Sequence, residues 1–542
     1  MPEPEDIPNQ RQSRRGFLKT GAAALTTAAA AGMPATTTAA PKRGGMLRFA
    51  TRSDARGADP HRNLIYNVSQ PLAATSQGLL DLAYNMEPAP GIATEWDIAD
   101  DLQTYTFKLR RDVTFHNGAD VDAAAVKWNF ERIMDPKIGH TLSRSSLENI
   151  KEITVVDKHT LRCTLKTPSS VFLANIVYYP CNLIAPDSAD QADSHPIGCG
   201  PFKFKSWKRW DRTEMLRYEN YFETDPKGNP LPYLDGIVGL PKKQDRARLN
   251  ALQDGDADLI DHLGYADISQ FRRKFAGDFQ TWNVPQVATA WVGFNFKTGP
   301  FSYQNPDSQA LRQAAAHAID RDAIHQSVFY GLGTIAKGFY GPDSPWYMPD
   351  IKGGPEYDPD KARFLLRKHS AQNTPIILVS RQDFAYMHQA GELVQAMWAE
   401  VGFKAVHEIH PNQVLREKYR KGAREAGHYD ADSAANSYRA DPDGWFHRSL
   451  FSASPTTKLR SGYQSERADE LIHLARETRA RDKRMQIYTD VENIINEELP
   501  LIYTHTVPLL QGGVKTLAGY QPAFAGPFST AGSGIRTAYF TK

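Results

Sequence analysis

Hydrophobic and polar residues alternate in short runs through residues 100–300. The run Tyr105–Leu109 alternates aromatic and aliphatic residues with threonine and lysine, which is the pattern of a strand with one buried face. Two further runs, 153–155 and 161–165, flank Asp157-Lys158-His159 and predict a β-hairpin. This part of the chain is therefore expected to be rich in strands.

Helical spacing dominates residues 305–500. Asp358-Pro359 supplies an N-cap and a proline at the first helical position, and Gly402 follows a run of apolar residues at helical spacing over 384–401. In the first half, Asp122 is expected to cap one helix whose apolar face consists of Val126, Phe130 and Ile133. Strands that alternate with helices predict an α/β fold.

The first forty residues have the layout of an export signal. Paired arginines stand in Ser13-Arg14-Arg15-Gly16-Phe17-Leu18-Lys19, an alanine-rich run follows, and small residues cluster at 35–40. This order predicts a twin-arginine signal peptide over residues 1–40, whose exact cleavage site the sequence leaves open. Because no cysteine lies near the cleavage zone, we expect no membrane anchor, and the mature protein is predicted to be periplasmic.

Composition narrows the class of protein. The chain has 542 residues with 64 Lys and Arg against 62 Asp and Glu, so no basic surface for nucleic acid is indicated. Three cysteines exclude a disulfide scaffold and a four-cysteine zinc site. Cys163 is expected to be a buried strand residue, whereas Cys181 and Cys199 could form a disulfide or remain thiols.

Sequence motifs for catalysis and for cofactors are missing. The chain contains no G-x-S-x-G, H-E-x-x-H, P-loop or C-x-x-C pattern. His407 and His410 lie in a predicted strand, where positions three apart point to opposite faces and do not readily hold one metal ion. We therefore expect a binding protein without metal or cofactor rather than an enzyme, and we keep a secreted hydrolase as the alternative.

Several short blocks follow one another in a fixed order from Gly44 to the C-terminus. The blocks are Gly44–Ala50, Asp59-Pro60-His61, Pro90–Trp96, Tyr105–Arg110, Val113–Gly118, Gly198–Phe202, Gly293–Phe296, Leu311–Ala314, Ala318–Arg321, Tyr357-Asp358-Pro359 and Asp441-Pro442-Asp443. Each block alone is weakly specific, but all of them in this order resemble the family 5 (peptide/nickel, cluster C) solute-binding proteins of ABC importers.

The resemblance implies a two-lobed periplasmic-binding-protein fold with the ligand in the cleft between the lobes. Lobe I would comprise residues 44–290 with a strand-rich sub-domain at about 84–206, lobe II residues 291–505, and residues 506–542 would return to lobe I. The chain would cross between the lobes near Ala288–Asn295 and Tyr503–Pro508. The implied function is capture of a small peptide or peptide-like solute by a monomer that delivers it to an inner-membrane ABC permease. Sensing of a solute, without import, is a further alternative.

The segment Asn436–Asp443 departs from the family pattern. In peptide-binding members, an aspartate three residues before the Asp-Pro unit pairs with the amino terminus of the peptide, but here that position is Tyr438. Arg439 follows it, and a guanidinium suits a carboxylate or phosphate. An anionic, capped or sugar-like (opine-type) solute thus becomes an alternative to a peptide. Arg439 could instead pair with Asp441 or Asp443.

Other candidate ligand-binding residues come from scattered positions. They are Asn436 beside Tyr438, Tyr66 and Asn67 after the first strand, Arg144 in lobe I, and Trp445. Tyr66 and Asn67 are chosen because lobes of this type present the loops after their strands to the cleft.

Overall fold

The computed structural model describes residues 41–63, 71–83, 85–275, 277–421, 428–522 and 534–541. Residues 41–542 form one compact unit. The predicted signal peptide, 1–40, lies outside the described residues, as do Tyr66 and Asn67. Among the described helices, none has both the length and the apolar character that a membrane crossing requires.

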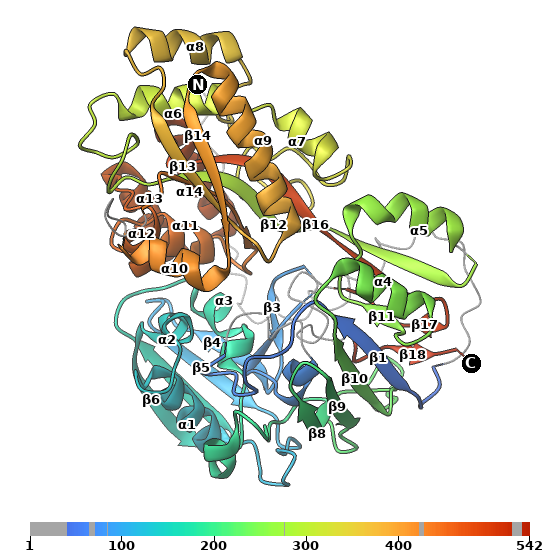
Figure 1. The fold of residues 1–542 in the computed structure, drawn as a ribbon. Helices are drawn as coiled ribbons and strands as arrows, with labels where there is room; N and C mark the ends of the chain where they lie inside the picture. Colours follow the sequence, from blue (N-terminus) through green and yellow to red (C-terminus); the bar gives the residue numbers. More distant parts are fainter. Residues whose placement is uncertain are drawn as a thin grey trace, which may run out of the picture. The chain divides into compact units, whose positions relative to one another are not determined.

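A single mixed sheet runs through the described part of the chain (Figure 1). From one edge to the other its ten strands are β14 (Lys404–His410), β13 (Pro375–Arg381), β15 (Ala431–Ser437), β12 (Phe279–Phe294), β16 (Leu501–Val514), β11 (Leu259–Ile260), β1 (Met46–Thr51), β10 (Gly236–Pro241), β9 (Arg212–Arg217) and β8 (Phe202–Lys208). β1 pairs in parallel with β10 and β11, and β13 pairs in parallel with β14 and β15. Parallel pairs of this kind on both sides of β12 and β16, with helices between the strands, give the α/β architecture that the alternating pattern predicts.

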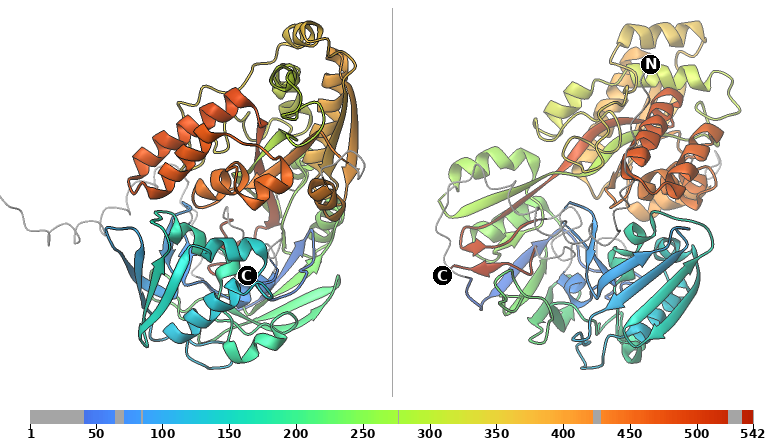
Figure 2. Two further views of the ribbon diagram at one scale, coloured as in Figure 1. Left: turned by 90° about the vertical axis from the view of Figure 1, so that its left-hand side faces the viewer. Right: turned by 180° about the vertical axis from the view of Figure 1, so that it is seen from behind.

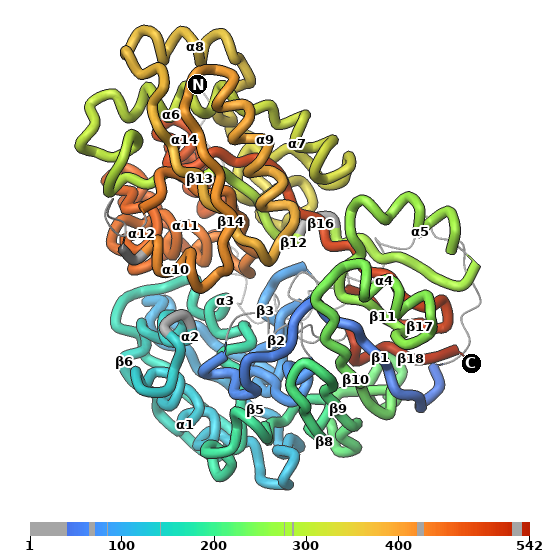
Figure 3. Tube along the Cα trace, viewed as in Figure 1, coloured from blue at the N-terminus to red at the C-terminus, as the bar shows by residue number. Residues whose placement is uncertain are grey.

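The long antiparallel strands β12 and β16 connect the two ends of this sheet. Their pairing shifts register between Val284 and Ala288. Beyond the shift, the part of β12 that follows Ala288 also pairs with β15, whereas the far end of β16 pairs with β11. Figures 2 and 3 show the two strands side by side between the upper and lower parts of the view.

A second, antiparallel sheet lies within the segment expected for the sub-domain. Its strands occur in the order β4 (Ala93–Ile98), β5 (Thr104–Leu109), β7 (Thr160–Leu165) and β6 (Ile150–Asp157). The predicted strand at Tyr105–Leu109 and the hairpin around Asp157–His159 are both confirmed. The predicted helix is confirmed as α1 (Ala123–Met134), because the side chain of Asp122 accepts a hydrogen bond from the Ala125 amide at 2.9 Å.

The remaining helices mostly surround the β12–β15 end of the main sheet. They are α2 (Thr141–Leu147), α3 (Phe172–Ile176), α4 (Asp245–Gln253), α5 (Ile268–Lys274), α6 (Ser308–His317), α7 (Arg321–Ser327), α8 (Pro359–Lys368), α9 (Ala385–Val401), α10 (Asn412–Lys421), α11 (Asp443–Ser449), α12 (Pro455–Arg460), α13 (Glu466–Glu477) and α14 (Arg481–Glu498). The predicted caps of α8 and α9 are present. The side chain of Asp358 accepts a hydrogen bond from the Lys361 amide at the start of α8, and Gly402 ends α9 in the left-handed conformation, with φ of 114°.

Short strand pairs and single turns of 3-10 helix complete the fold. They are β2 (Leu80–Leu82) with β3 (Pro88–Pro90), β17 (Leu517–Ala518) with β18 (Tyr539–Phe540), and the turns Pro71–Thr75, Tyr179–Cys181, Pro186–Gln191 and Tyr265–Asp267. Phe540 lies against Gly45, where an added Cβ would come within 2.7 Å of the Phe540 ring and where φ is +88°. Both the space and the backbone require glycine at this position.

All three cysteines are buried thiols. Cys163 lies in β7, as the alternation predicts, and Cys181 and Cys199 are not joined in the structure. Burial raises the pKa of each thiol to about 12, so the reactive thiolate is scarce at neutral pH.

We therefore expect iodoacetamide at pH 7.5 to leave the folded protein unmodified. The same reagent should add three carbamidomethyl groups once the chain is unfolded in urea, as counted by intact mass spectrometry. A mass two units lower than that of three thiols after mild oxidation would instead reveal a disulfide between Cys181 and Cys199.

Candidate functional site

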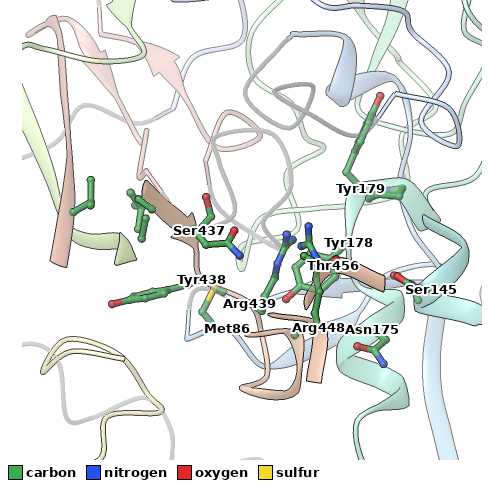
Figure 4. A pocket seen from close by; sticks show the side chains of 18 of the residues that line it. Met86, Ser145, Asn175, Tyr178, Tyr179, Ser437, Tyr438, Arg439, Arg448 and Thr456 are labelled. Atoms are coloured by element: carbon green, nitrogen blue, oxygen red, sulfur yellow. The ribbon is translucent and has the colours of Figure 1, made fainter. Parts of the chain in front are cut away.

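A cavity of about 900 Å³ lies between the sub-domain side and the helices that follow β15. A cavity of this size and depth suits a small solute. Its polar lining includes residues from several elements, of which the following enter the argument: Arg144, Ser145, Asn175, Tyr178, Asn436, Ser437, Tyr438, Arg439, Arg448, Thr456 and Arg476. Figure 4 shows Tyr178, Arg439, Arg448 and Thr456 gathered on one side of this cavity.

The turn between β15 and α11 holds one wall of the cavity through buried ion pairs. Asp441 forms two parallel hydrogen bonds with Arg484, at 2.6 and 2.5 Å. Asp443 lies 3.2 Å from Arg476, and burial raises the pKa of Asp443 to about 6 against the opposing effect of that arginine. Both aspartates of the Asp-Pro-Asp unit therefore pair with other arginines. The alternative prediction, in which Arg439 pairs with Asp441 or Asp443, is wrong.

Arg439 extends from this turn into the cavity. Its guanidinium lies 5.2 Å from the ring centroid of Tyr178, which is a cation–π contact with a residue far away in the sequence. The hydroxyl of Tyr178 accepts a hydrogen bond from the backbone amide of Ala440, so the ring is held against the turn from the opposite side of the cavity. Among the described residues, no carboxylate forms an ion pair with Arg439.

Arg448 lies next to Arg439 and projects from the last turn of α11. Its Nε atom is buried and has no hydrogen-bond partner among the described residues. Burial, followed by the nearby charge of Arg439, lowers the pKa of Arg448 to about 9. The guanidinium remains charged at neutral pH and is not neutralised by any described carboxylate.

Three other predicted site residues also line the cavity. Tyr438 is 6% exposed, and its hydroxyl lies 3.2 Å from that of Thr289, so only part of the residue reaches the cavity surface. Figure 4 shows its ring directed away from Arg439. Asn436 and Arg144 line the cavity from β15 and α2.

Trp445 is not among the residues that line the cavity. It is 1% exposed, its ring stacks on Phe339 with centroids 4.2 Å apart, and its Nε1 donates to the hydroxyl of Tyr503 at 3.2 Å. The turn of α11 directs this side chain into the core beneath the cavity wall. Direct ligand contact by Trp445 is therefore not supported by this conformation.

Tyr178 and Arg448 were missed by the sequence analysis. Tyr178 reaches the cavity only because the fold brings it to Ala440, which is 262 residues away. Arg448 follows a run in which Trp445, Phe446 and His447 could belong to any buried helix. The one available signal was the helical spacing of Gly444 and Arg448, which places both on the face of α11 that lines the cavity.

Cationic side chains outnumber acidic ones in the described lining. Eight lysine and arginine residues line the cavity, namely Arg52, Arg144, Lys166, Arg381, Arg416, Arg439, Arg448 and Arg476. Three carboxylates do so, namely Glu148, Asp261 and Asp443. Asp261 and Asp443 are already paired with Arg52 and Arg476, so the potential inside the cavity is positive.

Several contacts join the sub-domain segment to the helices across the cavity. The amide and the hydroxyl of Ser170 both donate to the carbonyl of Arg476, at 2.8 and 2.9 Å. Glu87 forms an ion pair with Arg481 at the start of α14. Together with the bond between Tyr178 and Ala440, these contacts enclose the cavity from both sides.

A buried carboxyl lies below the same wall. Glu492 in α14 is 0% exposed and accepts a hydrogen bond from the Phe339 amide at 2.7 Å. Burial raises its pKa from 4.5 to about 8. In the folded protein this group therefore retains its proton at a pH where the unfolded chain has released it.

We expect the folded protein to become less stable as the pH rises from about 4.5 towards 8. In this range the Glu492 carboxyl ionises in the unfolded chain but stays protonated in the folded protein, so a higher pH favours unfolding. The free energy of unfolding should fall by up to about 1.4 kcal/mol per pH unit in this window. Glu492→Gln should flatten this slope, as measured by urea denaturation at pH 5.5 and 7.5. The exposed Glu470→Gln is the matched control, and an equal slope in Glu492→Gln and wild type would contradict the prediction.

Comparison with known proteins identifies the class of this chain. Residues 87–458 match the profile of the family described as bacterial extracellular solute-binding proteins, family 5 Middle. The chain belongs to this family. As a family 5 solute-binding protein it is 28% identical over 456 residues to the glutathione-binding protein GsiB of Escherichia coli O6:K15:H31, a match that covers 82% of this chain and 85% of GsiB.

Solved structures show the same fold. The periplasmic binding protein DppA from Helicobacter pylori, in complex with the peptide STSA, has a TM-score of 0.79 and 24% identity, covering 92% of this chain and 99% of DppA. The binding protein AgaA from A. tumefaciens R10, in complex with agropinic acid, has a TM-score of 0.76 and 24% identity over the same shares of the two chains. The two-lobed α/β fold of this family 5 solute-binding protein is thus confirmed.

Membership of the family also confirms the general function. The chain is a solute-binding protein homologous to the binding proteins of ABC importers for peptides and for glutathione. Its relatives are binding proteins rather than enzymes, and membership of an extracellular family implies a periplasmic location.

Proposed function

We propose that this protein captures a peptide or peptide-like solute in the cavity that Tyr178 and Arg439 line, and delivers it to an inner-membrane ABC permease. The observation that supports this most directly is the cavity of about 900 Å³, to which both sides contribute polar as well as apolar side chains. The relatives named above include proteins whose descriptions state that they bind glutathione or the peptide STSA. Import fits this evidence better than catalysis, because the relatives are binding proteins.

The lobes that close on this solute are proposed to be residues 44–290 with 506–542, and residues 291–505. The crossings near Ala288–Asn295 and Tyr503–Pro508 would then fall in β12 and β16, next to the register shift between Val284 and Ala288. A local irregularity in a strand pair is a suitable place for a hinge. Closure would form the contacts of Tyr178, Ser170 and Glu87, and the permease would release the solute by favouring the open state.

Native mass spectrometry of the protein purified from the periplasm tests this function. We expect a fraction of the protein to carry a small molecule that is released when the chain is denatured. A protein that releases no small molecule, and that binds none of the peptides or related acids offered to it, would contradict the role in solute capture. Loss of solute uptake on deletion of the partner permease would separate import from sensing.

The proposed export route makes its own prediction. Replacing Arg14 and Arg15 with lysine is expected to leave precursor in the cytoplasm, because the twin-arginine receptor reads that pair. Immunoblots of periplasmic and cytoplasmic fractions measure the result, with Arg11→Lys as the control in the same segment. Normal periplasmic levels of the double variant would be incompatible with the twin-arginine route.

A further inference from the structure

Two guanidinium groups lie together on one side of the cavity without an acidic partner. Arg439 and Arg448 are close enough for the charge of one to affect the other, and Figure 4 shows them side by side near Tyr178 and Thr456. The carboxylates closest in sequence are already occupied, because Asp441 pairs with Arg484 and Asp443 with Arg476. In the part of the chain that the structure describes, neither arginine has an ion pair.

This arrangement is costly for the protein alone. Both residues are half-buried, so each guanidinium loses part of its hydration without gaining an ion pair, and the second cation beside it adds repulsion. The buried Nε of Arg448, which has no hydrogen-bond partner among the described residues, shows that the protein itself does not satisfy this donor. Arg416 and Arg460 add to the positive field, although Arg460 is paired with Asp432.

The surroundings also fit an acidic group of a solute. The ring of Tyr178 covers one face of Arg439, so the guanidinium is fixed in position and can use its edge for hydrogen bonds. Thr456 and Ser437 line the cavity close by and offer hydroxyl donors. A primary ammonium placed here would meet two cations, so the amino terminus of a peptide is excluded from this position.

We propose that Arg439 and Arg448 form a subsite for the carboxylate or phosphate of the solute, and that the physiological solute is anchored by this acidic group rather than by a free amine. This inference rests on the proposed function, because it assigns a chemical class to the solute in the same cavity. Arg439 contributes its guanidinium, which extends from the turn and can form two parallel hydrogen bonds with an acidic group. Arg448 contributes its Nε–H, which has no hydrogen-bond partner among the described residues.

The test compares solutes whose acidic or basic groups are free in one form and blocked in another, with agropinic acid as a further acidic probe. The probes are glutathione and its diethyl ester, agropinic acid, and the peptide Ser-Thr-Ser-Ala in two forms, N-acetylated with a free carboxylate and C-terminally amidated with a free amine. The molecule released from the purified protein is identified by mass spectrometry and titrated with the same variants. We expect the released molecule to carry a free acidic group, and probes that bind to weaken by at least about tenfold when that group is esterified or amidated.

One variant and its control test whether the preference for an acidic solute depends on the proposed subsite. Arg448→Gln is expected to weaken binding of the released molecule by at least about tenfold while leaving the melting temperature of the empty protein unchanged or higher, because it removes a half-buried cation that has no ion pair among the described residues. An arginine that only supported the fold would lower the melting temperature when replaced. The control is Arg363→Gln, whose exposed ion pairs with Asp360 and Glu400 lie outside the cavity.

The outcomes distinguish this inference from the proposed function. Equal affinity for an acid and its ester or amide, or wild-type affinity in Arg448→Gln, would overturn the acidic subsite while solute capture stands. A released molecule without any acidic group would do the same. A protein that releases nothing and binds none of the probes would overturn solute capture and the subsite together.

Discussion

Replacing Arg484 with methionine is expected to lower the free energy of unfolding by about 3–5 kcal/mol. The change leaves Asp441 buried without its two hydrogen bonds of 2.6 and 2.5 Å, and both side chains are less than a tenth exposed. The loss therefore comes mainly from the uncompensated carboxylate, and it should appear in urea denaturation followed by tryptophan fluorescence. The turn that carries Arg439 should also become less ordered.

A paired variant separates charge from packing. Arg484→Met combined with Asp441→Asn should recover much of the lost stability, since no buried charge is then left alone. Arg467→Met breaks an exposed ion pair with Glu497 and should change stability very little. If Arg484→Met behaved like Arg467→Met, the Asp441–Arg484 pair would not be what fixes the turn.

Arg439→Ala is expected to reduce affinity for the released solute by about 2–5 kcal/mol, or roughly 30-fold or more. The guanidinium enters the cavity, faces Tyr178 at 5.2 Å and is not neutralised by a described carboxylate, so the solute would supply the missing charge. Arg439→Lys should recover only part of this loss, because an ammonium cannot form two parallel hydrogen bonds with a carboxylate. Titration calorimetry of wild type and both variants measures the effect.

Tyr178→Phe is the matched control for Arg439→Ala. It keeps the ring that faces Arg439 but removes the hydroxyl that contacts Ala440, so it should affect closure more than recognition of the acidic group. Unchanged affinity in Arg439→Ala would remove the reason to prefer an acidic solute over an ordinary peptide. A peptide held by another anchor would then be the better account.

Local patterns carried most of the predictions that proved correct. The cap at Asp122, the hairpin turn at Asp157–His159 and the end of α9 at Gly402 each depend on residues within a few positions of one another. Such features are set by backbone geometry and by short-range hydrogen bonds, which the sequence displays directly. The order of blocks then identified the family, and with it the two-lobed fold.

The cavity was harder to predict because its members come together only in the folded chain. Arg439 was found through a departure from a family pattern, whereas Arg448 had no pattern to distinguish it from other arginines near helix ends. Trp445 was assigned to the site by its place in the sequence, but the helix turns it into the core against Phe339. Which face of α11 meets the cavity depends on packing over long sequence distances, and a single sequence does not display that.

The contact between Gly45 and Phe540 has a practical consequence. These residues lie near the first and the last of the residues that the structure describes, and their close approach brings these two points of the chain next to one another. A short linker could join them, and new ends could be opened at the exposed hairpin turn around Lys158. The chain would then be circularly permuted with its sheet order unchanged, and a fluorescent reporter fused at the new ends would sit beside the β6–β7 hairpin.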